Sequence, residues 1–357
     1  MTKELNMKKK FIIFTIAIMV VFTCIQIVTA QEKSRLKKIS LVYSDHSPPD
    51  TSGAIFFKKE YLPKIQKELA GVGYELDVTF HHAESLYKYN DQVNVCEAGI
   101  IDITLFSLDY EINRAPLHEV IVMPLLGFNE FSATRVWFEL QETIPEFGSE
   151  LSPFKELFHF NALPRVFNMK IEARVPKDYK GLKIQCPTMV GEMFQSIGAF
   201  PIQQSPIDWK ESLKNNLIDG IVTGITGIPL FDLQDAVKVH IMPSEDSFGL
   251  QGASIIMNRE KFESFPPEVQ KVLNDNVMWA SMRMTEIEAN NIPKNIKICK
   301  DRGNKFIYLT KKEMDEWYKV FIPLHEKWIK KIESMGLPGQ KVYDEAKRLA
   351  IKYRNQK

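Results

Sequence analysis

Between residues 178 and 224, predicted strands alternate with predicted helices, and this alternation limits the possible folds more than any other feature. The run LKIQC (182–186) is apolar-rich and lies between a glycine and a proline, which predicts a short buried strand. Helices are predicted over about 188–197 and 208–216, and LIDGIVTG (217–224) returns as a strand. Strands joined by single helices of this length connect by right-handed crossovers, so we expect an α/β fold with a parallel sheet.

The ends of these strands indicate where a ligand would bind, because ligands of such sheets lie at the carboxyl ends of the strands. Gln185 and Thr223 lie at or near two of these ends. Thr188 is a candidate N-cap, and Asp208 with Glu211 three residues later has the pattern of a capping box, so both helices carry start signals. Gln185 and Thr223 are therefore the first candidates for a binding site.

The first 30 residues have the pattern of a leader rather than of a folded domain. Three lysines at 8–10 precede the apolar run FIIFTIAIMVVF (11–22), and Val-Thr-Ala at 28–30 resembles a small-residue cleavage site. The apolar run is short for a membrane span, although an uncleaved anchor is the alternative. We expect a signal peptide over 1–30 and a periplasmic protein.

The expected mature chain, 31–357, is longer than one typical core, which predicts two lobes. The 46 basic and 45 acidic residues fall to 42 and 44 when the leader's four lysines and one glutamate are removed, a net charge of −2. This balance argues against nucleic acid as a partner. Cys96, Cys186 and Cys299 are too few and too scattered for a disulfide framework or a zinc site, so three buried thiols are expected, although one pair could bond.

No catalytic motif is visible in the sequence. It contains no G-x-S-x-G, P-loop, G-x-G-x-x-G or H-E-x-x-H pattern. Asp45, His46 and Ser47 are the residue types of a catalytic triad, but contiguous residues do not make a triad, whose geometry is built in three dimensions. His81 and His82 would point to opposite faces of a strand, so a shared metal ion is not expected. We therefore expect neither catalytic nor metal-binding residues.

Three segments, taken in order, resemble a known family. They are the pattern KGLKI…P…GAFP…IDG within 180–220, LYKYNDQVNVCEAGIIDITLFS (86–107) and FPPEVQKVLND (265–275). They resemble the DctP-type solute-binding proteins that serve tripartite ATP-independent periplasmic (TRAP) transporters. The resemblance extends over most of the chain after the leader.

The resemblance implies a two-lobed periplasmic binding protein fold, with hinge strands and a long helix spanning both lobes. Lobe I is expected over 31–162 and 251–295, and lobe II with the C-terminal helices over 163–250 and 296–357. A small organic solute, first of all a carboxylate, would bind between the lobes, and the membrane subunits of a TRAP transporter would be the partners. No cofactor and no enzymatic activity are implied. A ligand-sensing periplasmic receptor that feeds a signalling partner is the alternative.

The resemblance also singles out Arg165. In the family an arginine at this place binds the substrate carboxylate, and a second arginine follows 20 residues later, where this chain has Gln185. Thr223 replaces the family's usual asparagine. A guanidinium is a permanently charged fork of donors, whereas glutamine is a neutral amide. Either the solute is still a carboxylate held by Arg165 and neutral hydrogen bonds, or it is neutral or zwitterionic and Gln185 and Thr223 recognise its hydroxyl or amide groups.

Structural roles compete with these binding roles. Arg165 could form a surface or interlobe salt bridge, and Gln185 could bond the backbone. Four further residues are weaker site candidates because of their places in the predicted fold: His46 and Ser107 follow predicted strands, Gln251 lies on a predicted return strand, and Trp209 would be an apolar wall or simply core.

The rest of the chain predicts the framework of the two lobes through its apolar periodicity and its turn residues. Strands are expected over 39–44, 74–81, 100–106, 158–169 and 248–258, a buried strand and a turn over 120–128, and helices over 53–70, 85–98, 266–291 and 340–353. Pro293 should kink or end the long helix, and Thr310 with Glu313 predicts a capping box for a helix near the C-terminus.

Overall fold

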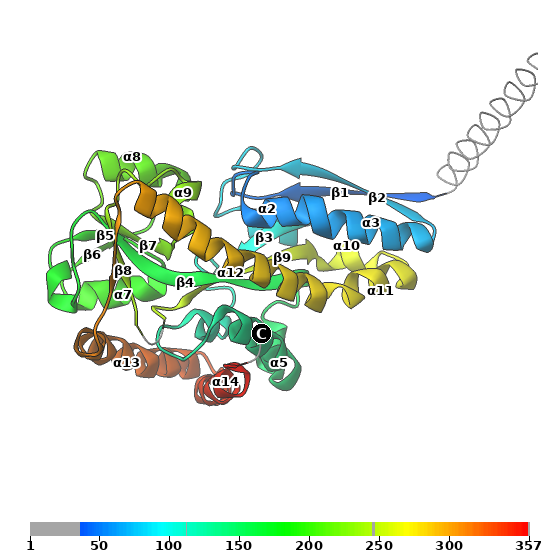
Figure 1. Ribbon diagram of the computed structural model, residues 1–357. Helices are drawn as coiled ribbons and strands as arrows, with labels where there is room; N and C mark the ends of the chain where they lie inside the picture. The colour runs from blue at the N-terminus through cyan, green and yellow to red at the C-terminus, as the bar shows by residue number, and fades with distance from the viewer. Residues whose placement is uncertain (1–35, 112, 245–246, 356–357) are drawn as a thin grey trace, which may run out of the picture.

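The computed structural model describes residues 36–111, 113–244 and 247–355, so the expected leader at 1–30 lies outside the described residues. Two groups of strands are joined into one ten-stranded sheet with the order β2-β1-β3-β9-β4-β7-β5-β6, and β8 and β10 extend it from β4 (Figure 1). The strands are β1 (Lys37–Ser44), β2 (Tyr74–His81), β3 (Ile103–Ser107), β4 (Phe154–Met169), β5 (Lys183–Gln185), β6 (Phe200–Ile202), β7 (Gly220–Gly224), β8 (Val239–Met242), β9 (Leu250–Asn258) and β10 (Lys305–Tyr308).

The helices cover the faces and the lower edge of this sheet. No helix in the described ranges is both long enough and apolar enough to cross a membrane. The helices are α2 (Ser52–Phe56), η1 (Phe57–Tyr61), α3 (Leu62–Gly71), α4 (Gln92–Glu97), η2 (His118–Val122), α5 (Glu130–Thr143), α6 (Pro145–Ser149), η3 (Pro176–Tyr179), α7 (Thr188–Ser196), η4 (Pro206–Asp208), α8 (Trp209–Lys214), α9 (Gly227–Leu230), α10 (Arg259–Glu263), α11 (Pro267–Asp275), α12 (Val277–Asp301), α13 (Lys311–Ser334) and α14 (Gly339–Tyr353).

The strand pairings define two lobes. In the first lobe β1 runs parallel to β2 and β3, and β9 closes the group antiparallel to β3. In the second lobe β5 runs parallel to β6 and β7, and β8 runs parallel to β10. The expected α/β fold with parallel strands is therefore present in both lobes.

The long strand β4 belongs to both lobes. Over 154–164 it pairs with β9 of the first lobe, and over 165–169 it pairs with β7 of the second. A register shift between Ala162 and Pro164 lies close to the crossing point, and such irregularities bend a strand locally. Arg165 is the first residue on the second-lobe side of this crossing.

The helix α12 also spans both lobes, as the resemblance implies. It packs against α2, α5 and β4 and reaches α9 of the second lobe. The amide of Asn291 donates to Ser52 Oγ of the first lobe at 3.1 Å, and the amide of Asn295 donates to Thr226 Oγ1 of the second at 3.3 Å. Pro293 lies between these two contacts without ending the helix. The expected helix over 266–291 is instead divided into α11 and α12 at Asn276.

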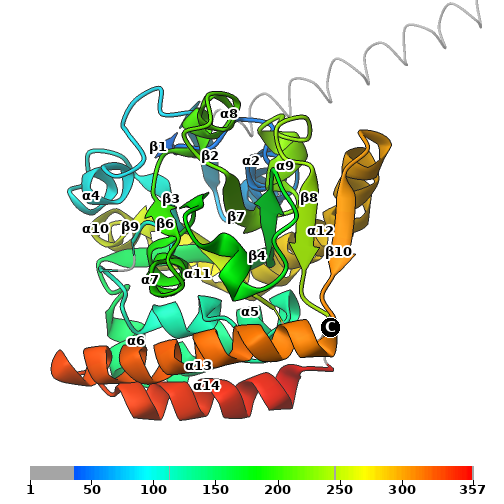
Figure 2. The ribbon, with the colours of Figure 1, turned by 90° about the vertical axis from the view of Figure 1, so that its left-hand side faces the viewer.

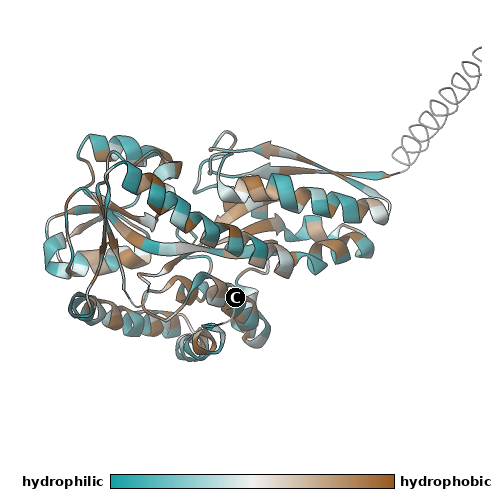
Figure 3. Ribbon diagram, viewed as in Figure 1, coloured by the Kyte–Doolittle hydropathy of each residue, from teal (hydrophilic) through white to brown (hydrophobic). Residues whose placement is uncertain are grey.

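The C-terminal helices lie along the lower edge of the molecule (Figure 2). They contribute to one hydrophobic core in each lobe. Trp317 and Phe321 of α13 pack in the second-lobe core, whereas Trp328 of the same helix and Ala350 of α14 pack in the first-lobe core. Hydrophobic and hydrophilic residues alternate along α12 and α13 (Figure 3), so each helix has one face for the core and one for solvent. Because α13 contributes to both cores, the sequence limits of the lobes remain a prediction.

The structure departs from several local expectations. The run 120–128 is not a strand, because its buried first part forms the 3₁₀-helix η2. A continuous apolar run without alternation cannot distinguish a buried strand from a buried helix. The helix expected over 85–98 is reduced to Gln92–Glu97, where Val93 and Cys96 are buried. The Asp208 side chain does not cap α8, whereas Thr310 and Glu313 form the expected capping box.

The three cysteines of the described residues are buried and free. Burial raises the pKa of Cys96 and Cys186 to about 12 and that of Cys299 to about 11. At neutral pH all three are therefore thiols rather than thiolates, which makes them poor nucleophiles. Their surroundings are those of structural, not reactive, cysteines.

Candidate functional site

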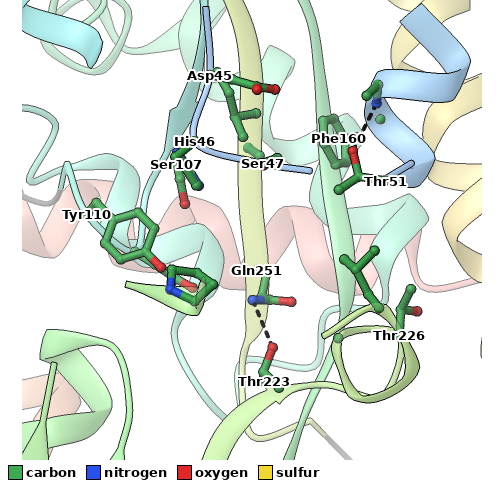
Figure 4. A pocket seen from close by; sticks show the side chains of 18 of the residues that line it. Asp45, His46, Ser47, Thr51, Ser107, Tyr110, Phe160, Thr223, Thr226 and Gln251 are labelled. Atoms are coloured by element: carbon green, nitrogen blue, oxygen red, sulfur yellow. Dashed lines mark hydrogen bonds between the residues drawn. The ribbon is translucent and has the colours of Figure 1, made fainter. Parts of the chain in front are cut away.

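A cavity of about 190 Å³ lies between the two lobes, and we call it the interlobe cavity. The first lobe contributes the segment after β1, the end of β3, part of β9 and one residue of α12. The second lobe contributes Thr223 of β7 and residues of α8 and α9. The carboxyl ends of β1, β3 and β7 all open on this cavity, which is where sheets of this kind bind ligands (Figure 4).

Five of the seven residues predicted for the site line the interlobe cavity: His46, Ser107, Trp209, Thr223 and Gln251. They come from five separate segments of the chain that the fold brings together. Figure 4 shows Ser107 and His46 on one side and Gln251 pointing toward Thr223.

On the first-lobe side the loop after β1 is held by a buried carboxylate. Asp45 accepts hydrogen bonds from the hydroxyl of Tyr43 at 2.7 Å and from Nδ1 of His82 at 2.8 Å. The neighbouring His46 packs edge-to-face on Tyr110 at 5.5 Å between ring centroids, and burial lowers the pKa of His46. At neutral pH His46 is therefore an uncharged imidazole. Asp45 orients His82 rather than His46, so residues 45–47 do not form a triad.

On the second-lobe side the polar contacts are weak or missing. Gln251 Nε2 donates to Thr223 Oγ1 at 3.4 Å, and the Gly224 N–H donates to Gln251 Oε1 at 3.4 Å. Both distances are at the long limit of a hydrogen bond, so a ligand can replace them at small cost. The Nε1 atom of Trp209 is buried and has no hydrogen-bond partner among the described residues. The indole N–H of this lining residue is thus an unused donor.

The two lobes also touch at the rim of the interlobe cavity. Ser205 Oγ of the second lobe donates to Glu84 Oε1 of the first lobe at 3.0 Å. This bond and the weaker contact between Gln251 and Thr223 connect the two lobes on either side of the interlobe cavity. Both contacts would break if the lobes moved apart.

Arg165 and Gln185, the two residues given most weight in the sequence, do not line the interlobe cavity. The guanidinium of Arg165 is only 1% exposed; Nη1 donates to the carbonyl oxygen of Val122 at 3.1 Å, and Nη2 is paired with the carboxylate of Asp109. Asp109 itself lines the interlobe cavity, so it stands between Arg165 and the space for a ligand. The predicted alternative of an interlobe salt bridge is thus realised.

Both Arg165 and Gln185 have a buried polar atom without a partner within the described residues. These atoms are Nε of Arg165 and Oε1 of Gln185, whose residue is 3% exposed. Buried polar atoms are normally bonded, so unpartnered ones usually have a reason such as an absent water or ligand. Arg165 therefore keeps at least one donor unused.

Sequence reasoning missed two acidic residues of the interlobe cavity. Asp109 follows Ser107 by two residues, so its place just after a strand end was the signal for it. Glu288 lies on α12, four residues after the buried Met284, which places an acid on the apolar stripe of that helix. Glu288 is 7% exposed, and burial raises its pKa to about 7.

The arrangement is suited to binding rather than to chemistry. Within the described ranges no group of three or more His, Cys, Asp or Glu residues is placed to hold a metal ion. The wall combines aromatic and aliphatic side chains with a few polar groups, which is the usual composition of a small-molecule site. Two α/β lobes, a shared hinge strand and a cavity between them define a solute-binding protein.

The family comparison gives the particular class. The chain belongs to the bacterial extracellular solute-binding proteins, family 7 (DctP), whose model matches residues 58–331. It is therefore an extracytoplasmic solute-binding protein and not an enzyme, as predicted. The C4-dicarboxylate-binding protein DctB of Bacillus subtilis is 24% identical over 175 residues, 47% of this chain. The matched part spans 48% of DctB, about half of its length.

Solved structures show the same fold over whole chains. A marine metagenome TRAP solute-binding protein specific for aromatic acids, in complex with 3-hydroxybenzoate, has a TM-score of 0.81 and 24% identity, covering 88% of this chain and 99% of its own. A TRAP solute-binding protein from Rhodoferax ferrireducens T118, in complex with copurified benzoate, has a TM-score of 0.80 and 19% identity, covering 88% and 98%. The two-lobed architecture is thus that of known solute-binding proteins.

Proposed function

We propose that this protein captures a small organic carboxylate outside the cytoplasm and delivers it to the membrane subunits of a TRAP transporter. The observation that carries the proposal is Arg165, a permanently charged guanidinium with an unused donor, buried beside the interlobe cavity at the crossing point of β4. Similar proteins bind a C4-dicarboxylate, 3-hydroxybenzoate and benzoate, which supports a carboxylate as the solute. The first 30 residues serve as the export signal.

In this proposal Asp109 holds the place of the ligand in the empty protein. A buried guanidinium needs a counter-charge, and Asp109 supplies it from the wall of the interlobe cavity. An incoming carboxylate shares or replaces this contact through the free Nε–H and the terminal amino groups, because a guanidinium carries five donors. Thr223, which lines the interlobe cavity, then adds a neutral hydrogen bond in place of a second arginine.

In this proposal, ligand binding is coupled to closure of the two lobes. Only a closed arrangement contacts the solute from Thr223 and Trp209 on one side and from Ser107 and His46 on the other. A ligand that binds the closed form better than the open one shifts the population toward it. The membrane subunits recognise the closed form.

Titration calorimetry of the purified protein with a panel of mono- and dicarboxylates tests the proposal. We expect at least one carboxylate to bind, and Arg165→Ala to weaken it by on the order of 2–5 kcal/mol because a desolvated charge contact is lost. Arg174→Ala is the matched control, since Arg174 pairs with Glu313 away from the interlobe cavity. Because Arg165→Ala leaves Asp109 unpaired, the double variant Arg165→Gln/Asp109→Asn is measured beside it.

Unchanged carboxylate affinity in both Arg165 variants would remove Arg165 from the site. Loss of binding in Arg165→Ala and in the double variant, with Arg174→Ala unaffected, would support it. Asp109→Asn sharpens the test further: if Asp109 competes with the ligand for the guanidinium, this variant binds the carboxylate more tightly than the unaltered protein does.

A further inference from the structure

The charges that line the interlobe cavity are of one sign. Asp45, Asp109 and Glu288 line it, and within the described part of the chain no lysine or arginine does. Two of these acids are already satisfied, since Asp45 is bonded to Tyr43 and His82, and Asp109 is paired with Arg165. Glu288 differs from them, because no ion pair to it occurs among the described residues.

Glu288 is buried with little to compensate its charge. Desolvation is the first cause of its raised pKa of about 7, and a hydrogen bond with the Ser52 side chain opposes it. The elements α2 and α9, which pack on α12 near this point, carry no titratable side chain. Other elements that pack on α12 include α5 and β4. The titratable or charged residues that α5 carries are Glu130, Arg135, Glu139 and Glu142, and those of β4 are Lys155, Glu156, His159 and Arg165. The cavity wall adds Tyr43, Asp45, His46, Asp109 and Tyr110, the segment η1 after α2 adds Lys58, Lys59, Glu60 and Tyr61, and α12 itself adds Arg283, Glu286 and Lys294.

We propose, resting on the proposed function, that the carboxylate solute of this protein also carries a protonated amine, and that Glu288 receives this ammonium group. The solute is then an amino acid or a related amine-bearing acid. Its carboxylate lies toward Arg165, and its ammonium group lies toward α12 on the wall of the same interlobe cavity.

The physical reason is that ionisation of a buried carboxyl costs free energy when no cation is near. A cationic ligand removes this cost and is therefore attracted to the site. An ammonium group forms charge-assisted hydrogen bonds with a carboxylate, and these are stronger than neutral ones. A plain carboxylate would instead add a negative charge to a cavity whose wall already holds three carboxyl groups. Such a ligand would require Glu288 to stay protonated.

A buried donor without a partner supports a ligand that also carries acceptors. Trp209 lines the interlobe cavity and is 5% exposed, and its indole Nε1–H has no hydrogen-bond partner among the described residues. A buried donor needs an acceptor, and the carboxylate oxygens of an amino acid supply one. The aromatic and aliphatic wall, which includes Phe160 and Leu230, leaves room for an apolar side chain between the two charged ends.

The two possible ligand types respond to pH with opposite signs. An ammonium ligand needs the ionised form of Glu288, whose population rises about tenfold between pH 6 and pH 8 for a pKa of about 7. Its affinity should therefore rise by up to about tenfold over this interval. An amine-free carboxylate prefers the protonated form of Glu288, so its affinity should fall as the pH rises.

The test uses matched pairs of probes that differ only in the amine. Titration calorimetry at pH 6 and pH 8 compares L-leucine with 4-methylpentanoate, L-phenylalanine with 3-phenylpropanoate, and 4-aminobutyrate with butyrate. We expect the amine-bearing member of at least one pair to bind tenfold or more tightly than its partner at pH 8, with an affinity that falls at pH 6. Glu288→Gln should remove both the preference and the pH dependence.

Glu119→Gln is the matched control, because Glu119 is also buried with a pKa raised to about 7 but does not line the interlobe cavity. It should leave the preference and the pH dependence unchanged. If amine-free acids bind as well as their partners, or more tightly at pH 6, the inference is wrong while the proposed carboxylate function stands. Absence of binding by every amine-bearing probe also overturns it. If no carboxylate binds at all, the proposed function fails with it.

Discussion

Arg165 and Glu288 are both buried ionisable side chains beside one cavity, yet the fold treats them differently. Arg165 has a counter-ion, Asp109, whereas Glu288 is bonded to the hydroxyl of Ser52 and forms no ion pair within the described residues. A guanidinium stays charged at every accessible pH, so it must be paired even in the empty protein. A carboxyl can become neutral by taking up a proton, so it can remain unpaired until a cation arrives. The charge of Arg165 is therefore constant, whereas the charge of Glu288 depends on pH and on whether a cation is bound.

The largest effect on stability should follow when Arg165 loses its counter-ion Asp109. In Asp109→Ala the guanidinium of Arg165 stays buried and charged, so the free energy of unfolding should fall by about 3–5 kcal/mol. Urea denaturation measures this change. The double variant Asp109→Asn/Arg165→Gln should recover most of the loss. An unchanged denaturation midpoint in Asp109→Ala would mean that the ion pair does not stabilise the empty protein.

Ionisation of Glu288 should make the free energy of unfolding depend on pH. The carboxyl of Glu288 has a pKa of about 7 in the folded protein against an ordinary 4.5, so the folded state binds more protons between these values. Stability is therefore lost as the pH rises through this window, and the penalty is complete above about pH 7. Glu288→Gln should raise the free energy of unfolding by about 3 kcal/mol at pH 8 and hardly at all at pH 4.5. Thermal unfolding at both pH values checks this, and equal gains at both would indicate a packing effect instead.

Substitution of Gly249, a glycine with positive φ beside Arg165, should have a smaller effect on stability. Gly249 has φ +93°, and an added Cβ would clash with the carbonyl oxygen of Val122 and lie 3.0 Å from Nη1 of Arg165. Gly249→Ala should destabilise the protein by about 1–3 kcal/mol through backbone strain and displacement of the guanidinium. Gly303→Ala is the control, since Gly303 has φ +76° in open space. Equal losses in both variants, measured by denaturation, would show that the contact with Arg165 contributes nothing.

The smallest effect concerns the rim of the interlobe cavity. Ser205→Ala removes the hydrogen bond to Glu84 and should weaken the closed arrangement by about 0.5–1.5 kcal/mol. Stopped-flow measurement of ligand release should then show dissociation that is up to about tenfold faster. Ser264→Ala, which removes a bond to the Lys261 carbonyl on an exposed helix end, is the control. Identical release from both variants would show that the Ser205 bond does not hold the lobes together.

The sequence predicts the frame of this protein better than its site. The alternation of strands and helices, the capping box at Thr310 and the final helix depend on residues that are close in the sequence. The structure contains all three. The run 120–128 was assigned to the wrong element because a fully buried apolar segment has no alternation to read. Resemblance to a family, not periodicity, supplied Arg165, and its alternative role in a salt bridge is the one that the structure contains.

The rest of the site depends on contacts between distant segments. Asp109 is 56 residues from Arg165, and no spacing rule connects the two. Glu288 becomes part of the site only because α12 runs from one lobe to the other. His46, Ser107 and Gln251 could be named in advance because strand ends of an α/β sheet gather at one edge. Strand ends thus predicted most of the residues that line the cavity, whereas the pairing of Asp109 with Arg165 and the place of Glu288 on α12 depend on contacts that the sequence pattern does not show.

The way in which α13 and α14 complete the first-lobe core has a consequence for how the chain is made. Val93 and Trp137 share that core with Ala350, which lies close to the end of the chain. This cluster of the first lobe cannot exclude water until these late residues have been synthesised. The other hydrophobic cluster of the lobe, which includes Tyr43 and Phe158, extends only as far along the chain as Met284. Complete packing of the first lobe therefore requires nearly the whole chain, although the lobe contains the N-terminal strands.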